Sequence, residues 1–312
     1  MDVGTSDTRL LKYAIEIGRQ KSFTKAARNL HVAQPSLSQQ IAKLENELNM
    51  TLFYRHHHAV IPTPDGVRFL ERAEQVVRVH DDFIREMREH RGGIGSELTI
   101  GTPVITGGHM LPPILEAFHT RYPQVEVRLV EDSPHSLEES TAKGMTDLSI
   151  LPLPVEDPRL ATQIIGSEPI LLAFPSEPKD WMHAAQCDHL LSSNGVVDIS
   201  LSHLSLAPFI LLKAGYGFRN IVLELCAESG FQPEVAYQTS SIEMAQSLVA
   251  HGLGITLIPA MVQRLGEQKR PRYFSLNENP LRTLAFVYRK DRYLSMAARA
   301  FLDLFQEMQG LS

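Results

Sequence analysis

The chain has 312 residues, of which 43% are hydrophobic and 21% charged, and this composition is typical of a globular protein rather than a disordered or fibrous one. Its longest aliphatic and aromatic run near the middle, residues 170–174, is far shorter than the ~20 residues of a membrane helix. Residues 1–9 have no apolar stretch, and two cysteines cannot build a disulfide framework. We therefore expect a cytoplasmic protein of about two domains with no membrane partner.

The net charge of −6 is unevenly distributed along the chain. Residues 1–63 carry eight Lys or Arg and five Asp or Glu, which gives +3, so the remaining residues carry −9. A basic segment beside an acidic remainder indicates a module that meets a polyanion and is attached to a different domain. Taken alone, this asymmetry is a weak signal.

The first 61 residues are predicted to form three short helices and two strands. The first helix has an apolar stripe made of Leu10, Leu11, Tyr13, Ala14 and Ile17. Ser22-Phe23-Thr24 supplies an N-cap for a second helix over residues 25–30. A third helix opens with Pro35, and Asn49 is suited to end it in the left-handed conformation. Its apolar face consists of Leu37, Ile41, Leu44 and Leu48. Residues 52–53 and 60–61 look like short strands around a polar loop.

A helix of nearly 30 residues is predicted next. Thr63-Pro64-Asp65 is a strong helix start, and Gly92-Gly93-Ile94-Gly95-Ser96 ends the helix as a hinge. Apolar residues recur in a heptad pattern, which favours pairing with a second chain over packing onto the same domain. The seam consists of Phe69, Ala73, Val76, His80, Phe83 and Met87.

From residue 97 onward, strand and helix patterns alternate, which predicts a parallel α/β sheet. The pattern of residues 124–150 is repeated faintly in residues 233–257: a short strand, a Ser-capped helix, and a glycine before a second strand. We therefore expect two similar α/β halves with a cleft between them.

The helices over residues 24–30 and 35–48 have the spacing of a helix-turn-helix, whose second helix enters the major groove. Gln34 and Gln39 can make paired hydrogen bonds to adenine edges, and Ser36 and Ser38 are short donors and acceptors. Lys43, Arg55 and the helix N-terminus can contact phosphate groups. The alternative for the same side chains is an ordinary solvated helix face.

Residues 23–48, together with Leu52-Phe53-Tyr54-Arg55 and Thr63-Pro64-Asp65-Gly66, closely resemble the LysR-type transcriptional regulators. The resemblance is specific over residues 5–92 and looser beyond, where Leu111-Pro112, Tyr122-Pro123, Asp147-Leu148 and Gly252-Leu253-Gly254-Ile255 follow the family's order.

This resemblance implies an α/β protein with an N-terminal winged helix-turn-helix over residues 1–62 and a long linker helix that dimerises over residues 63–92. Residues 93–312 would form an effector-binding domain of two Rossmann-like subdomains resembling periplasmic binding proteins. Subdomain I would comprise about residues 97–168 and 271–312, and subdomain II about residues 169–270.

The resemblance also assigns DNA contacts. Base contacts fall on Gln34, Pro35, Ser36, Ser38 and Gln39, with Thr24 and Lys43 near phosphate. His58 stands where the family's wing has a minor-groove arginine, and a neutral His58 would attract a narrow A·T minor groove much less. Whether the wing contacts the minor groove is therefore left undecided by the sequence.

Three segments in the second half of the chain place hydroxyl groups at predicted helix starts. They are Thr102-Pro103-Val104-Ile105-Thr106, Ser133-Pro134 and Thr239-Ser240-Ser241, with Glu243 completing a capping box after Ser240. By resemblance, Thr102, Pro103, Ile105, Thr106, Ser133, Pro134, Thr239 and Ser240 line an effector cleft. Hydroxyls and helix N-termini suit a small carboxylate or other anion. Pro103 and Ile105 favour a smaller or less polar effector, and the alternative is that each hydroxyl only caps its own helix.

Other functions have less support in the sequence. His56-His57-His58 and the group His183, Cys187, Asp188 and His189 offer metal-ligand types without a second matching pair, so we expect no metal. Hydrolase, phosphate-loop, zinc-protease and dinucleotide motifs do not occur, so we expect neither an enzyme nor a cofactor.

We expect a regulator that binds dyad-symmetric double-stranded DNA as a dimer and, by resemblance, a tetramer. RNA polymerase is a further candidate partner.

Overall fold

The computed structural model describes residues 8–56, 59–89, 97–192, 199–264 and 270–310. The chain divides into two compact units, Met1–Gly95 and Ser96–Ser312, which are described separately. In the part of the chain covered by these ranges, no helix combines the length and the apolar character needed to cross a membrane.

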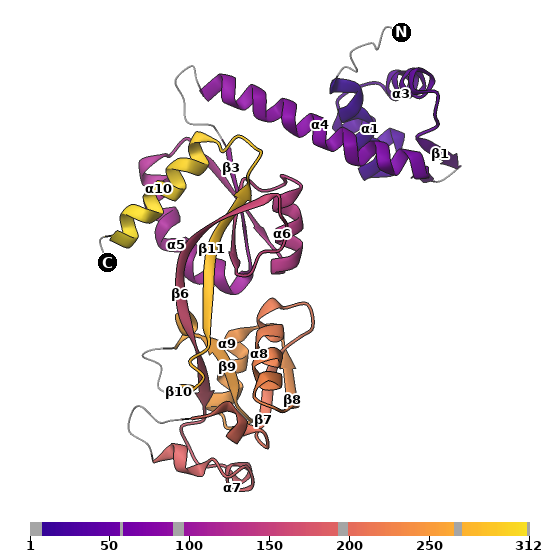
Figure 1. Ribbon diagram of the computed structural model, residues 1–312. Coiled ribbons are helices and arrows are strands. Elements are labelled where there is room, and N and C mark those ends of the chain that lie inside the picture. Colours follow the sequence, from indigo (N-terminus) through magenta and orange to yellow (C-terminus); the bar gives the residue numbers. More distant parts are fainter. Residues whose placement is uncertain (1–7, 57–58, 90–96, 193–198, 265–269, 311–312) are drawn as a thin grey trace. The chain divides into compact units, whose positions relative to one another are not determined.

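The first unit is a winged helix-turn-helix, as expected (Figure 1). Leu37, Ile41 and Leu44 of its third helix are fully buried. Asn49 ends that helix with φ 49°, and Ser22 accepts a hydrogen bond from the Lys25 N–H, so both sequence-predicted caps are confirmed. Two antiparallel strands form the wing. The elements are α1 (Thr8–Gln20), α2 (Phe23–Asn29), α3 (Gln34–Leu48), β1 (Phe53–His56), β2 (Ala59–Pro62) and α4 (Pro64–Glu89).

The start of α4 is fixed to the wing by one side chain. Thr63 Oγ1 accepts a hydrogen bond from the Gly66 N–H at 2.9 Å and donates one to the Thr51 carbonyl at 2.7 Å. Because the hydroxyl caps the helix and binds the preceding segment at once, it sets the direction in which α4 leaves the wing. This agrees with the helix start predicted from Thr63-Pro64-Asp65.

The second unit contains two α/β subdomains joined by two long strands. Subdomain I contains β3 (Glu97–Thr102), α5 (Val104–Arg121), β4 (Glu126–Glu131), α6 (Pro134–Ala142), β5 (Leu148–Pro152) and α10 (Met296–Gly310). In its sheet, β3 pairs in parallel with β4 and β5. The Phe286 and Phe118 rings pack against Phe301 of α10 at 6.2 and 5.4 Å between ring centroids. These aromatic contacts attach α10 to the rest of the subdomain.

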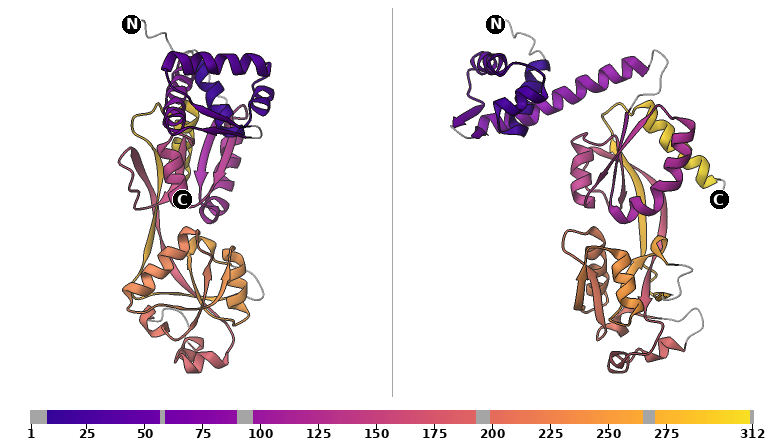
Figure 2. Two further views of the ribbon diagram at one scale, coloured as in Figure 1. Left: turned by 90° about the vertical axis from the view of Figure 1, so that its right-hand side faces the viewer. Right: turned by 180° about the vertical axis from the view of Figure 1, so that it is seen from behind.

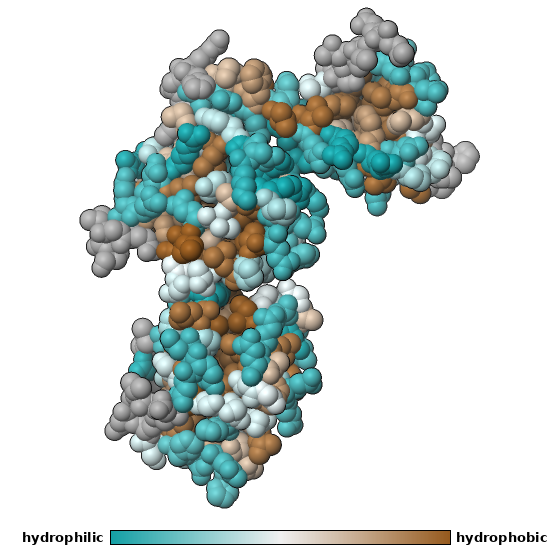
Figure 3. Space-filling model, in the orientation of Figure 1, coloured by the Kyte–Doolittle hydropathy of each residue, from teal (hydrophilic) through white to brown (hydrophobic). Residues whose placement is uncertain are grey.

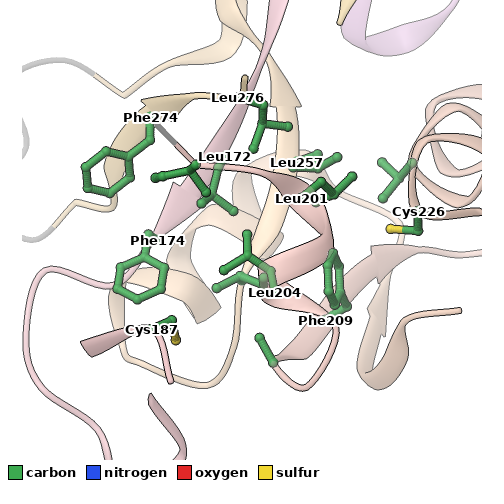
Figure 4. Close-up of a cluster of buried hydrophobic side chains, with 14 of the residues drawn as sticks. Leu172, Phe174, Cys187, Leu201, Leu204, Phe209, Cys226, Leu257, Phe274 and Leu276 are labelled. Carbon is green, nitrogen blue, oxygen red and sulfur yellow. The ribbon is translucent and has the colours of Figure 1, made fainter. Parts of the chain in front are cut away.

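Subdomain II is built around a separate apolar core (Figure 4). This core includes Phe174, Phe209 and Leu257, and both cysteines are part of it. The helices are α7 (Asp180–Ala184), α8 (Gly217–Glu228), α9 (Ile242–Ala250) and the short 3-10 turns Asp188–Leu191, Leu201–Leu204 and Ala260–Val262. The strands are β7 (Pro208–Leu212), β8 (Glu234–Thr239), β9 (Thr256–Pro259) and β10 (Arg272–Ser275).

The long strands β6 (Leu160–Phe174) and β11 (Leu281–Arg289) run between the subdomains (Figures 1 and 2). Up to Pro169, β6 pairs antiparallel with β11; from Ile170 onward it pairs with β9 and β10. The expectation of a parallel sheet is therefore corrected, because these crossing strands make the sheet mixed. The second part of subdomain I begins with β11 rather than at about residue 271, because β10 still pairs inside subdomain II.

A buried ion pair lies where β6 changes partners. Glu168 and Arg282 face each other across the strands, and only 14% and 5% of their side chains are exposed. Arg282 donates to Glu168 Oε1 from Nε at 2.9 Å and also from Nη2, while Glu168 Oε2 accepts the Met261 N–H at 2.9 Å. The pair thus joins both crossing strands and the turn after β9.

We predict that Arg282→Met lowers the free energy of unfolding of the second unit by about 3–5 kcal/mol, because Glu168 then stays buried without its cation. Removing both charges in Arg282→Met/Glu168→Met should recover most of the loss. Urea unfolding followed by fluorescence of Trp181, the chain's single tryptophan, measures this. Arg128→Met, at an arginine that is 57% exposed, is the control and should cost about 0–1 kcal/mol. Equal losses for Arg282→Met and Arg128→Met would contradict the prediction.

Candidate functional site

One face of α3 consists of exposed polar residues. Its apolar face is buried under α1 and α2, so the opposite face is fixed in place and points to solvent. The first turn has no capping side chain, because Ala33 occupies the N-cap, so its N–H groups are open to an anion. Gln34, Pro35, Ser36, Gln39 and Lys43 are exposed, and Ser38 is half-buried.

The residues predicted to contact phosphate lie around this face. Thr24 is exposed in the first turn of α2. Lys43 Nζ lies 3.7 Å from Glu47 Oε1, an exposed pair too weak to hold the lysine away from a phosphate group. Arg55 belongs to β1, but its side chain, like all of His58, is outside the described residues.

The predicted seam of α4 is divided between two environments. Ala73 is buried against Leu11 and Ile15 of α1, and Phe69 packs against the same residues. This end of the seam therefore packs onto its own domain and not onto a second chain. Farther along, Val76, Phe83 and Met87 are 51%, 54% and 42% exposed, and His80 is half-buried. Hydrophobic surface patches lie along α4 (Figure 3). Only this second part is left for a partner.

A pocket of about 330 Å³ lies between the subdomains of the second unit. Subdomain I contributes the starts of α5 and α6 and the end of β5, and subdomain II contributes the start of α8. Figure 3 shows hydrophobic residues gathered where the subdomains meet. Five of the eight predicted effector residues line the pocket: Pro103, Ile105, Thr106, Ser133 and Pro134.

Gly217 brings the two walls of the pocket together. A Cβ atom at this position would lie 2.7 Å from the ring carbons of Pro134, across the gap between the subdomains. Only glycine allows so close an approach without displacing the proline. Gly217 is also the first residue of α8, so the helix starts at this point of contact.

The other three predicted effector residues lie outside the pocket lining. Thr102 is fully buried, and its Oγ1 donates to the Pro103 carbonyl at 3.2 Å. The capping box predicted from Ser240 is wrong, because α9 begins one residue later and Ser241 is its N-cap: Ser241 Oγ accepts the Met244 N–H at 3.1 Å and donates to Glu243 at 2.6 Å. Thr239 Oγ1 accepts the Ser241 N–H at 3.2 Å. Thr239 and Ser240 therefore belong to the approach to α9.

Several pocket residues were not predicted from the sequence. Tyr216, Phe218 and Ile221 add apolar surface, while Asp132 and Arg282 add charge. Asp132 accepts hydrogen bonds from Ser136 Oγ and the Ser133 N–H, both at 2.7 Å, and these bonds lower the pKa of Asp132 below its usual value. The residue before a Ser-Pro helix start is a local signal that could have identified Asp132. Arg282 has no comparable signal, since a strand pairing about 150 residues farther along the chain brings it here.

Both thiols lie in the apolar core of subdomain II, where Figure 4 shows them apart from one another. Burial raises the pKa of Cys187 to about 11 and that of Cys226 to about 12. Because the thiolate is the reactive form, less than about one thousandth of either residue is reactive near neutral pH. The arrangement is that of packing residues.

The residue types that suggested a metal site do not assemble into one within the described part of the chain. His183 Nδ1 lies 3.3 Å from Asp188, but no third His, Cys, Asp or Glu joins them there. Cys187 points into the core instead. His57 and His58 are outside the described residues.

Comparison with known families gives two matches. The family described as "Bacterial regulatory helix-turn-helix protein, lysR family" matches residues 8–67, and the "LysR substrate binding domain" matches residues 91–310. The chain is 51% identical over 308 residues to the HTH-type transcriptional regulator YcgK of Bacillus subtilis, covering 96% of this chain and 94% of that protein. It is 30% identical to the DNA-binding transcriptional dual regulator OxyR of Escherichia coli, covering 95% of both.

Solved structures of similar proteins share the fold over nearly the whole chain. A full-length OxyR variant from Pseudomonas aeruginosa has a TM-score of 0.68 and 25% identity, with 96% of each chain covered. CbnR complexed with its target DNA has a TM-score of 0.63 and covers 96% of this chain and 98% of that one. At 22% identity, the second likeness concerns the fold alone.

We predict that both thiols of the folded chain react at least about a hundredfold more slowly with a dithiobis-nitrobenzoate reagent than in urea, because both are buried and protonated. Ser202→Cys, at an exposed position, is the control and should add one rapidly reacting thiol. The absorbance of the released thiolate follows each reaction. A native thiol that reacts as fast as the control cysteine would refute this account of the core.

Proposed function

Because the chain belongs to the LysR-type family of transcriptional regulators, which bind DNA and carry an effector-binding domain, we propose that α3 reads DNA and that the pocket of the second unit holds the effector. One observation carries the proposal: the family's DNA-binding and substrate-binding matches fall on two separate compact units. We assign no reaction and no cofactor to the chain, and we place its action in the cytoplasm, with RNA polymerase as a candidate partner.

The exposed face of α3 supports the first half of the proposal. Gln34 and Gln39 can form paired hydrogen bonds with adenine edges, while Pro35, Ser36 and Ser38 lie between them. Thr24, Lys43 and Arg55 are the proposed phosphate contacts, which position α3 without reading sequence. The face is held in place by the buried side chains of Leu37, Ile41 and Leu44 on the opposite side of the helix, as a base-reading helix requires.

The exposed end of the α4 seam supports self-association. Val76, Phe83 and Met87 share one face of the helix, and a patch of this kind is typical of an interface. Two chains paired along α4 would place their two α3 helices about a twofold axis, so the proposed target is a dyad-symmetric site. Pairing of such dimers into a tetramer completes the proposed assembly.

The pocket supports the effector role because both subdomains line it. A small molecule that contacts both walls binds best to one degree of closure and shifts the population of subdomain arrangements toward it. The α5 start has no capping side chain, since Pro103 is its N-cap, and Arg282 lines the same pocket. Open helix N–H groups and a guanidinium suit a carboxylate on the effector.

Several relatives bear the name hydrogen peroxide-inducible genes activator, and these include proteins 29–30% identical to this chain. A peroxide response needs a thiolate that is exposed to solvent. Cys187 and Cys226 are buried and protonated in this chain. We therefore place the signal in the pocket rather than on a thiol.

We predict that Gln34→Ala weakens binding to a DNA site selected from a random library by about 1–3 kcal/mol and leaves random DNA unaffected. Lys43→Ala should weaken both alike and reduce the salt dependence, because it removes one phosphate contact. Fluorescence anisotropy at several salt concentrations measures both effects. Gln75→Ala, an exposed position on α4, is the control. If Gln34→Ala matched this control on both DNAs, the assignment of α3 would be wrong.

We predict that Phe83→Asp makes a fragment of residues 1–92 monomeric, because the new carboxylate would lose its water in the interface. Sedimentation velocity gives the mass. Gln75→Asp adds the same charge at another exposed position of α4 and should leave a dimer. A dimer mass for Phe83→Asp would exclude pairing along this face.

A further inference from the structure

The pocket between the subdomains contains unbalanced charge. Its charged lining residues are Asp132, an exposed carboxylate, and Arg282, which donates to Glu168 from Nε and Nη2. Within the described ranges, no Lys, Arg or His lies within ion-pair distance of Asp132. The site therefore offers a carboxylate that has no cation of its own.

Asp132 is held in place as an ionised group. Its Oδ1 accepts the Ser133 N–H and its Oδ2 accepts Ser136 Oγ, which fixes the carboxylate beside the start of α6. Each carboxylate oxygen can accept more than one hydrogen bond, so both can still accept a donor from a ligand. A ligand that brings an ammonium group would supply both the donor and the missing positive charge.

Two further polar groups of the lining lack a partner among the described residues, and their residues, unlike Asp132, are more than nine-tenths buried. Thr106 Oγ1 has no hydrogen-bond partner, and Thr106 is fully buried. Arg282 uses Nε and Nη2 on Glu168, and Nη2 also contacts Met261, which leaves Nη1 without an acceptor in the described part of the chain. An unpaired buried hydroxyl is costly, so Thr106 Oγ1 indicates a polar ligand. Arg282 Nη1 can donate to the same ligand, and a guanidinium prefers a carboxylate.

The remaining wall is apolar. Ile105 and Pro134 face the pocket from subdomain I, and Phe218 and Ile221 from subdomain II. The Phe218 ring also lies under the Arg282 guanidinium, at 5.8 Å from its centroid, and so helps to fix that group. A volume of about 330 Å³ is at the small end of ligand pockets.

We propose that the effector is an amino acid with an apolar side chain, whose ammonium binds Asp132, whose carboxylate binds Arg282 Nη1 with Thr106 Oγ1, and whose side chain contacts the apolar wall. This inference rests on the proposed function and goes beyond it by requiring two opposite charges on one small molecule. A plain carboxylate would leave Asp132 without a cation, and a plain amine would leave Arg282 Nη1 unpaired.

Calorimetric titration of the full chain with matched probes tests this. The first set is L-leucine, 4-methylpentanoate and 3-methylbutylamine; the second is L-phenylalanine, 3-phenylpropanoate and 2-phenylethylamine. At least one amino acid should bind about tenfold or more tighter than both of its analogues, since each analogue lacks one charge-assisted contact. Asp132→Asn should remove the preference over the carboxylate. Glu131→Gln, at the neighbouring exposed carboxylate outside the pocket lining, should retain it.

Three results would overturn the inference. They are carboxylate analogues that bind as tightly as the amino acids, an unchanged preference in Asp132→Asn, and no binding of either amino acid at millimolar concentration. Ile105→Trp, which fills the pocket, separates this failure from that of the proposed function. If carboxylates bind and Ile105→Trp abolishes that binding, the pocket remains the effector site and only the amino-acid class is wrong. If an amino acid binds equally to Ile105→Trp, the pocket assignment itself fails. Unchanged DNA binding and thermal unfolding verify that each variant is folded.

Discussion

The Glu168–Arg282 ion pair is the constraint on which the second unit depends. It lies at the point where β6 leaves its pairing with β11 and joins β9 and β10, and Glu168 also binds the backbone after β9. Since one partner without the other would be a buried unpaired charge, the two strands are held in a single register there. The same arginine lines the pocket, so the link between the subdomains is also part of the site.

Because Arg282 belongs both to the pocket and to the crossing strands, a ligand in the pocket contacts the element that joins the two subdomains. Its walls come from both subdomains, and Gly217 already approaches Pro134 as closely as a residue without a side chain allows. In the proposed mechanism, the subdomains change their closure about the two crossing strands while the ion pair keeps the strands together. A ligand between the walls would then change the closure rather than the register, and two such degrees of closure are the kind of two-state element that a regulator needs.

Local features of the sequence predicted most of the first unit. The helix caps make contacts only a few residues away along the chain, as at Ser22, Asn49 and Thr63. Together with the apolar face of α3, such local patterns were enough to predict these helices. The full extent of the long strands was not predicted, because residues 161–169 of β6 are half-buried or exposed and include Gly166 and Pro169. Arg282 and Phe218 reach the pocket only through the tertiary fold, which no local pattern reports. The cap of α9 was assigned to Ser240 although the helix is capped by the next residue, Ser241.

Hydrogen exchange of the full chain, with and without the tightest-binding amino acid of the panel, tests the central claim that one ligand is held by both subdomains. The account predicts slower exchange at the starts of α5 and α6 in subdomain I and at the start of α8 in subdomain II, all in the same experiment. Protection confined to one subdomain, or found only away from these three helix starts, would contradict it.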